Sequence, residues 1–361
     1  MKNRTWLILL FTIVFSLTYT SCSQNDATVL LGNWTVSSQL EGGNRNGAFG
    51  FTIGNTGYLG GGYNAQKYNN RMLTDFWSYT PNEDYGSWTK MDSFPKRLNI
   101  NGKDSIVEAR FHAVSFSIGN VGFVGTGFNE YSRHYMNDFY RFDPSAAPGN
   151  QWSAVDPLPG LGRYGAIAFS VKGKAYVGCG MGSDGVIKKD FYQFNPDAAS
   201  GSQWTSISFG GDSRLFGSTF VIGDNAYIVA GQNSLFNFDF WVFDGNTERF
   251  RKLRDIKPIS TLSYDDDYAS IRRCSANGLS ANGKGYLAGG SGTSESNSVW
   301  EYDPQTDLWY KKIGFEGATR SEAVSFSMAN GRMFVTTGLS STNSLDDTWE
   351  FFPNAIYDPN Y

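Results

Sequence analysis

Residues 163–204 read RYGAIAFSVKGKAYVGCGMGSDGVIKKDFYQFNPDAASGSQW, and this stretch decides the fold. Small and apolar residues alternate over 165–171, the period-2 pattern of a half-buried strand. A lysine-glycine-lysine turn signal follows, and a second strand over 175–178 ends at glycine. A third strand over 190–194 stops at an Asn-Pro turn, and Trp204 begins a fourth. The stretch therefore predicts one sheet of four short antiparallel strands.

The same multi-position pattern occurs six times along the chain. Each copy opens with an arginine, continues through an aromatic strand that ends in glycine, and reaches a second aromatic strand that usually begins with aspartate. The opening arginines lie 47 to 65 residues apart and are Arg45, Arg110, Arg163, Arg214, Arg273 and Arg320. Internal repeats of about 50 residues, with four strands in each, are typical of the blades of a β-propeller.

The last copy is incomplete, and the start of the chain supplies what it lacks. After Trp349 only twelve residues remain, and none of them is a tryptophan. Residues 32–36 precede the first arginine and have the pattern of a fourth strand around Trp34. Trp34 and Trp88 are 54 residues apart, which is one repeat. We therefore expect the N-terminal strand to join the last blade and close the ring, which removes open sheet edges.

On these six copies the chain resembles the kelch-repeat propellers and is similar to the central domain of galactose oxidase. The resemblance implies an all-β, six-bladed propeller with four antiparallel strands in each blade, over residues 30–361. The length alone would allow two domains, but the repeat fills the chain and favours one. Because one fold hosts many activities, the resemblance does not identify the function.

Charge and cysteine content limit the partners of the chain. The formal net charge is −4, and no basic run occurs in the body of the chain, which argues against nucleic acid as a partner. Cys179 and Cys274 lie in different blades of the predicted ring. We expect them to be buried free thiols, because a disulfide would need a geometry that the pattern does not supply.

The first residues have the pattern of a targeting segment. Lys2 and Arg4 precede an apolar stretch over 6–17 that is too short to span a membrane. Tyr-Thr-Ser then precedes Cys22, which resembles the cleavage box of bacterial lipoproteins of the Bacteroidetes type, although leucine is usual at the place of Tyr19. The resemblance implies a signal peptide over 1–21, a lipidated Cys22, a tether over 22–29 and export to the outer membrane, with the protein facing the periplasm or the cell surface. The alternative is an ordinary secretory signal.

The opening arginines are the first candidates for a binding site. In a propeller they would form a ring at one mouth of the central channel, and we expect Arg110, Arg163, Arg214, Arg273 and Arg320 to bind a ligand there. Six guanidinium groups in one concavity repel each other unless carboxylates or an anionic ligand lie between them. The alternative is structural: each arginine bonds carbonyl groups or an acidic side chain of the adjacent blade.

Two long connections break the symmetry of the repeat, and long loops on a rigid scaffold tend to carry function. They cover residues 95–109 and 257–271, and we expect both on the arginine side. Tyrosines in the loops between second and third strands supply flat surfaces on which a sugar could stack. These are Tyr63, Tyr68, Tyr131 and Tyr135.

The sequence favours a binding protein over an enzyme. A copper site like that of galactose oxidase is not expected, because the only two histidines, His112 and His134, belong to one blade and no metal-ligand pattern accompanies them. We expect no cofactor and no metal. The leading hypothesis is a non-enzymatic lipoprotein of the cell envelope that binds a glycan or protein segment, preferably an anionic one, and that contacts the membrane only through its lipid. The alternative, from a resemblance to six-bladed kelch proteins that interconvert sialic-acid anomers, needs an arginine for the carboxylate and Glu108 or Asp265 to move the proton.

Overall fold

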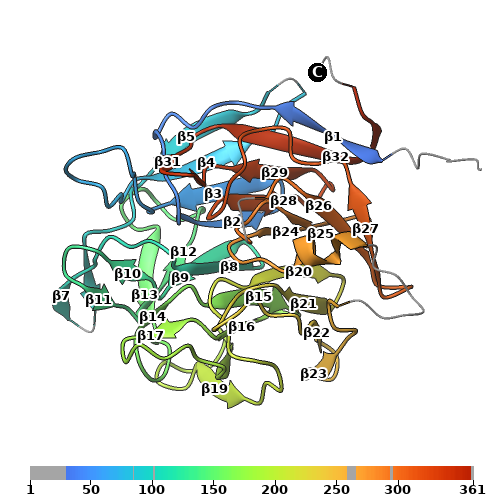
Figure 1. Cartoon of the computed structure of the whole chain (residues 1–361). Helices are drawn as coiled ribbons and strands as arrows, with labels where there is room; N and C mark the ends of the chain where they lie inside the picture. Colours follow the sequence, from blue (N-terminus) through green and yellow to red (C-terminus); the bar gives the residue numbers. More distant parts are fainter. Residues whose placement is uncertain (1–29, 84, 101, 258–265, 293–295, 359–361) are drawn as a thin grey trace, which may run out of the picture.

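The computed structural model describes residues 30–83, 85–100, 102–257, 266–292 and 296–358, which form six four-stranded antiparallel sheets around a central channel (Figure 1). Blade 1 contains β2 (Phe49–Ile53), β3 (Thr56–Gly60), β4 (Phe76–Thr80) and β5 (Ser87–Met91). Blade 2 contains β8 (Val114–Ile118), β9 (Val121–Gly125), β12 (Phe139–Phe142) and β13 (Trp152–Val155). Blade 3 contains β15 (Ile167–Val171), β16 (Lys174–Gly178), β18 (Phe191–Phe194) and β19 (Trp204–Ile207).

The second half of the chain repeats this arrangement. Blade 4 contains β20 (Ser218–Ile222), β21 (Asn225–Val229), β22 (Trp241–Asp244) and β23 (Arg249–Lys252). Blade 5 contains β24 (Asn277–Ala281), β25 (Lys284–Ala288), β26 (Val299–Asp303) and β27 (Leu308–Lys312). Blade 6 contains β28 (Val324–Ser327), β29 (Met333–Thr336), β32 (Thr348–Ile356) and β1 (Leu31–Val36). The described helical structure is a 3₁₀ segment, Asp266–Ile271, so the all-β, six-bladed prediction is confirmed.

The N-terminal strand closes the ring, as the sequence predicts. β1 pairs antiparallel with β32, from Leu31 opposite Ile356 to Val36 opposite Trp349 (Figure 1). Trp34 is fully buried, and its indole stacks on Phe351 with ring centroids 4.5 Å apart. Joining the first and last parts of the chain in one sheet leaves no gap in the circle of blades.

Aromatic side chains hold neighbouring blades together. The second-strand aromatic of one blade contacts a third-strand aromatic of the next, as in Tyr176 and Phe243, whose centroids are 4.2 Å apart. The outer tryptophans reach back in the same way: Trp152 of β13 packs on Phe76 of blade 1 at 5.1 Å and on Phe142 of its own blade at 5.0 Å. Such aromatic pairs contribute about 0.5–1.5 kcal/mol each beyond the area they bury.

A closed ring of backbone hydrogen bonds joins the six inner strands where they begin. Its members are the residues two positions after each opening arginine, and each N–H donates to the equivalent carbonyl of the preceding blade over 2.8 to 3.2 Å. All have a left-handed backbone, with φ between 52° and 60°, which turns the N–H sideways toward the neighbouring blade. They are Gly47, His112, Gly165, Phe216, Ser275 and Glu322, and we call them the mouth ring.

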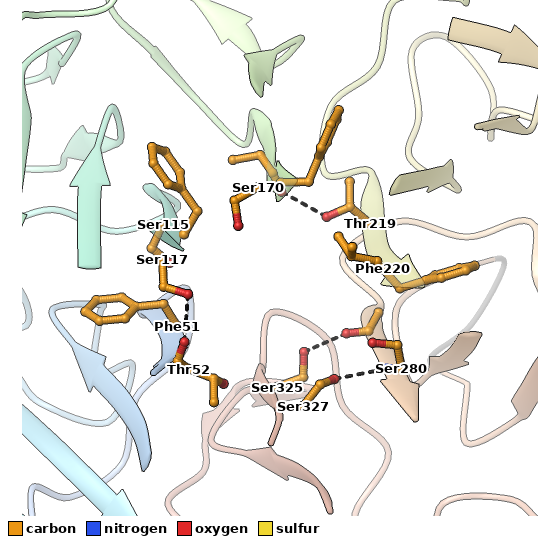
Figure 2. A pocket seen from close by; sticks show the side chains of 15 residues that line it. Phe51, Thr52, Ser115, Ser117, Ser170, Thr219, Phe220, Ser280, Ser325 and Ser327 are labelled. Carbon is orange, nitrogen blue, oxygen red and sulfur yellow. Dashed lines mark hydrogen bonds between the residues drawn. The ribbon is translucent and has the colours of Figure 1, made fainter. Parts of the chain in front are cut away.

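Below the mouth ring the inner strands line the channel with small and hydroxylated side chains. In Figure 2 serine and threonine side chains surround an open centre, which forms a cavity of about 280 Å³. Many of these hydroxyls donate to a carbonyl of the neighbouring inner strand, as Ser117 does to Thr52 over 2.7 Å and Thr219 does to Ala168 over 2.9 Å. These hydroxyls therefore act as links between blades.

Cys179 and Cys274 are buried free thiols, as predicted. Burial raises the pKa of the Cys179 thiol to about 12, so this group is chemically inert at neutral pH. The proposed lipidation residue, Cys22, lies outside the described residues. Within the described ranges, no helix has the length and apolar character needed to cross a membrane.

Candidate functional site

The opening arginines are buried in the structure. Each has a relative exposure of 0 or 1%. Five of them bind the aspartate at the start of the third strand of their own blade, over N–O distances of 2.6 to 2.8 Å, in the pairs Arg45–Asp75, Arg110–Asp138, Arg163–Asp190, Arg214–Asp239 and Arg320–Asp347. The same guanidinium groups donate to the carbonyl at the end of the second strand, as Arg163 does to Cys179 over 3.0 Å. The arginine thus ties three strands together at one point.

This geometry is the structural alternative, with the acidic partner in the same blade instead of the adjacent one. Burial alone would raise the pKa of Asp138, but the charge and hydrogen bonds of Arg110 outweigh it and hold that pKa below its usual value. The terminal nitrogens of Arg110, Arg163, Arg214, Arg273 and Arg320 are engaged within the protein. We therefore do not build the candidate site on these five residues.

Blade 5 departs from the rule because Ser298 stands where the other blades have aspartate. Arg273 donates to the hydroxyl of Ser298 over 2.6 Å and to the carbonyls of Gly289 and Ser270. Burial lowers the pKa of Arg273 to about 9, since serine supplies no compensating charge. Blade 5 therefore keeps the hydrogen bonds of the arginine but lacks the salt bridge that the other blades have.

The mouth ring lies at the opening of the channel and surrounds a depression of about 180 Å³. These six positions differ in side chain from blade to blade, although their backbone is the same in all. Three of them are small, one is aromatic, and two are ionisable. A symmetric scaffold thus presents an asymmetric set of side chains at one end of its channel.

His112 and Glu322 form a hydrogen-bonded pair at the mouth. The imidazole Nε2 lies 2.8 Å from a carboxylate oxygen of Glu322, and the side chains are only 12% and 18% exposed. Blade 1 separates their blades, and the imidazole passes over Gly47, where a Cβ would lie 2.6 Å from a ring carbon. Asn46 donates to the same carboxylate oxygen over 2.7 Å. Burial alone would raise the pKa of Glu322, but His112 and these hydrogen bonds lower it, so the carboxylate is ionised at neutral pH.

An arc of half-buried aromatic rings borders the pair on the side of blades 1 to 4. The centroids of neighbouring rings are 4.9 to 5.9 Å apart. His112 continues the arc, with its ring 4.7 Å from that of Phe216. We call the following residues the aromatic arc: Tyr63, Phe111, Phe128, Tyr135, Tyr164 and Phe216.

The remaining candidates lie around this centre. The Arg71 guanidinium donates to the hydroxyl of Tyr63 over 2.6 Å, and the Arg71 backbone N–H donates to Tyr131 over 2.9 Å. Tyr63 and Tyr135 belong to the arc, whereas Tyr68 is 90% exposed. Glu108 accepts from Ser132 and lies 3.2 Å from His134, apart from the His112 pair. Asp265 lies outside the described residues.

The long connection over residues 95–109 contains a hairpin of β6 (Arg97–Ile100) and β7 (Lys103–Ile106). β6 lies beside the outer strand β13, and the two strands border a groove of about 560 Å³. The hairpin thus lies along the outer strand of blade 2. Apolar side chains of β6 pack onto the core between blades 1 and 2, which explains its position. The middle of the other long connection, 258–265, lies outside the described residues.

Sequence reasoning missed the pairing of His112 with Glu322. The two residues are 210 positions apart, and only the closed ring brings their blades within reach of each other. A usable signal was present: both lie two residues after an opening arginine, at a position where the copies differ in side chain. The prediction was based on the arginine that all six copies share, whereas the asymmetry lies in the variable residue two positions after it.

Comparison with known proteins identifies the class. A family model described as "Kelch motif" matches residues 272–312, which cover the fifth blade from its arginine region to the end of β27. A solved structure titled "Structure of YjhT" superposes with a TM-score of 0.64 at 17% sequence identity, covering 86% of this chain and 95% of that chain. A search of curated proteins gave no match. The chain is a six-bladed β-propeller whose fifth blade matches the Kelch motif.

Proposed function

We propose that this propeller is an exported, lipid-anchored protein of the cell envelope that binds a glycan at the channel mouth without transforming it. The supporting observation is the arrangement around the mouth ring: half-buried aromatic faces lie on one side, and an ionised carboxylate with its imidazole and amide partners lies on the other. Sugar rings have apolar C–H faces and polar hydroxyl edges. They match a site whose aromatic surface lies beside oriented hydrogen-bonding groups.

The charges at the mouth define the ligand further. Glu322 can accept hydroxyl donors, and its hydrogen bonds with His112 and Asn46 keep it oriented before a ligand arrives. Arg71 lies at the outer end of the aromatic arc beside Tyr63, with its guanidinium 5.7 Å from the centroid of that ring. An acidic group on the glycan would bind Arg71. In this proposal Arg71 therefore binds the anionic group, a role that the sequence analysis gave to the repeat arginines. A peptide segment with an aromatic or acidic side chain is the competing ligand.

Binding can be tested on the chain from Asp26 onward with a glycan array, followed by calorimetry on the best neutral and acidic sugars. Replacing Tyr164 or Phe216 by alanine removes a stacking surface, and a loss of about 1.4 kcal/mol lowers affinity tenfold. Tyr68→Ala is the matched control, because this tyrosine is exposed outside the arc. Equal affinity in all three variants, or binding of peptides alone, would reject the glycan site.

An enzyme that interconverts the anomers of an acidic sugar, of the sialic-acid mutarotase type, is the second candidate. It is favoured by the His112–Glu322 pair, since adjacent imidazole and carboxylate groups can exchange protons with a ring oxygen. His112 Nδ1 is buried and has no hydrogen-bond partner among the described residues, so Nε2 beside Glu322 is the nitrogen on which this candidate rests. NMR exchange measurements on sialic acid distinguish the two candidates. If the wild type accelerates interconversion of the anomers and both His112→Asn and Glu322→Gln abolish the acceleration, the enzymatic proposal replaces the binding proposal.

A further inference from the structure

A strip of exposed apolar side chains lies where the first and last strands of the chain pair. Leu31 and Ile356 stand opposite each other in β1 and β32 and are 38% and 77% exposed. Leu30, Phe352 and Tyr357 lie beside them and are 38%, 40% and 41% exposed. We call these five residues the rim patch. Neither residues 30–36 nor residues 351–357 include a charged side chain, although 18% of the whole chain is charged.

The rim patch lacks the charged residues that usually protect an outer strand from contact with other surfaces. Natural edge strands carry lysines and arginines that discourage contact with other surfaces. The outer strands of three other blades follow this rule, with Lys90 in β5, Arg249 in β23 and Lys311 in β27. β1 has the sequence LGNWTV and lacks such a residue. The outer strands β13 and β19 also lack charged residues, but none of their large apolar side chains is exposed. Exposed apolar side chains on an uncharged edge are typical of a surface that contacts another apolar phase.

The topology places the rim patch at the end of blade 6 that is far from the mouth ring. β32 begins beside Asp347, which Arg320 holds on the mouth side, and runs away from that side. It has nine residues, whereas the third strands of the other blades have four or five. About four extra residues extend a strand by roughly 13 Å. The last of them, Ile356 at the end of β32, therefore lies at the end of the strand that is remote from the mouth ring.

We propose that the rim patch rests on the lipid bilayer and orients the propeller with its mouth ring facing away from the membrane. This proposal rests on the lipid anchor at Cys22 proposed above. Leu30 follows Cys22 by eight positions, and a chain of that length spans at most about 28 Å. The anchor thus keeps the beginning of β1 close to the lipid surface, and the apolar patch lies at that beginning. Leucine and isoleucine side chains enter the interfacial region, and tyrosine is favoured at its polar boundary.

The experiment uses the chain from Asp26 onward, which lacks the anchor but keeps every strand of the closed ring. It is floated with vesicles of phosphatidylethanolamine and phosphatidylglycerol in a 3:1 ratio (about the composition of a bacterial envelope). Wild type is expected to float, and Leu31→Asp/Ile356→Asp is expected to lower the bound fraction at least tenfold. Val186→Asp/Leu235→Asp is the matched control, since both side chains are exposed elsewhere on the surface.

Each outcome decides the proposal. Failure of the wild type to float, or an equal loss in the control, overturns it. A dimer in light scattering that the rim-patch variant dissociates shows that a second copy covers the patch, and overturns it as well. If the double variant melts at a lower temperature, Tyr357→Ser, which lies beyond the last strand, replaces it. Glycan affinity, measured on the same variants, remains unchanged if the mouth is the ligand site, so the two proposals fail separately.

Discussion

Replacing Arg214 by methionine tests whether the repeat arginines stabilise the fold or bind a ligand. Arg214 is fully buried, and its partner Asp239 is only 4% exposed on its side chain. The guanidinium donates to Asp239 over 2.6 Å and to the carbonyl of Ala230 over 3.1 Å. Methionine fills a similar volume but leaves the carboxylate without its cation. Removing one member of a buried ion pair costs about 3–5 kcal/mol, because the remaining charge stays desolvated.

The expected change in melting temperature follows from the size of the propeller. Unfolding entropy is about 2.1 cal/mol/K per residue, so about 330 residues give an entropy near 0.7 kcal/mol/K. A loss of about 3–5 kcal/mol then lowers Tm by roughly 4–7 °C, if the ring unfolds cooperatively. The double variant Arg214→Met/Asp239→Leu removes the stranded charge and is expected to recover most of this loss.

Differential scanning calorimetry of wild type and both variants measures the effect, with Arg71→Met as a control for an arginine at the edge of the mouth. Ligand affinity is measured in parallel at 20 °C, well below the transition. The structural role predicts a large fall in Tm for Arg214→Met and unchanged affinity. A fall of less than about 1 °C together with abolished binding would refute the reasoning and return the arginines to the ligand site.

Two further predictions concern the charges of blade 5 and of the mouth. Ser298→Asp should raise Tm by roughly 3 °C, because a carboxylate beside the buried guanidinium of Arg273 adds a charge-assisted hydrogen bond of about 2 kcal/mol; a lower Tm in calorimetry would contradict this. Glu322 has a lowered pKa in the folded protein, so its stabilising effect is complete above about pH 4.5, where an unfolded glutamate ionises, and is lost as the pH falls through the lower folded value. Glu322→Gln should therefore flatten the decline of Tm between about pH 5 and pH 3 relative to wild type, and identical declines would show that the pair contributes nothing.

The fold could be predicted from the sequence because the same sequence pattern recurs in each blade. Turn glycines and alternating strands recur in the copies, and five of the six fourth strands carry a tryptophan, with Phe250 in its place in blade 4, so a weak signal in one copy is supported by the others. Ring closure followed from a mismatch in one repeat, since the sixth lacked a fourth strand and the chain began with an unused one around Trp34. Such inferences depend on local pattern and on the count of repeats, both of which the sequence contains in full.

The site could not be predicted in the same way, because it depends on which side chains face each other across the channel. The sequence does not show that a left-handed backbone at Gly47 and His112 turns these residues toward the opening, nor that an imidazole can cross blade 1 to reach Glu322. It also does not show that Asp190 lies within 2.6 Å of Arg163, which makes that arginine structural. Repetition of a charged residue was compatible with either role until its partner was known.

One physical rule explains both the repeated arginines and the variable residues of the mouth ring. A residue that recurs in every blade satisfies a need that every blade has, and the buried arginine does so by neutralising an aspartate and binding the end of the second strand. A ligand is a single asymmetric object, and it can be recognised only where the copies differ. In this chain the copies differ in side chain two residues after the arginine, although the hydrogen-bonded ring gives these six positions the same backbone. Packing fixes two of them as glycine, since a Cβ at Gly47 would lie 2.6 Å from the His112 ring and one at Gly165 2.5 Å from Leu215. Substitutions at the other four positions would therefore alter the proposed ligand site while the buried arginines keep the scaffold unchanged.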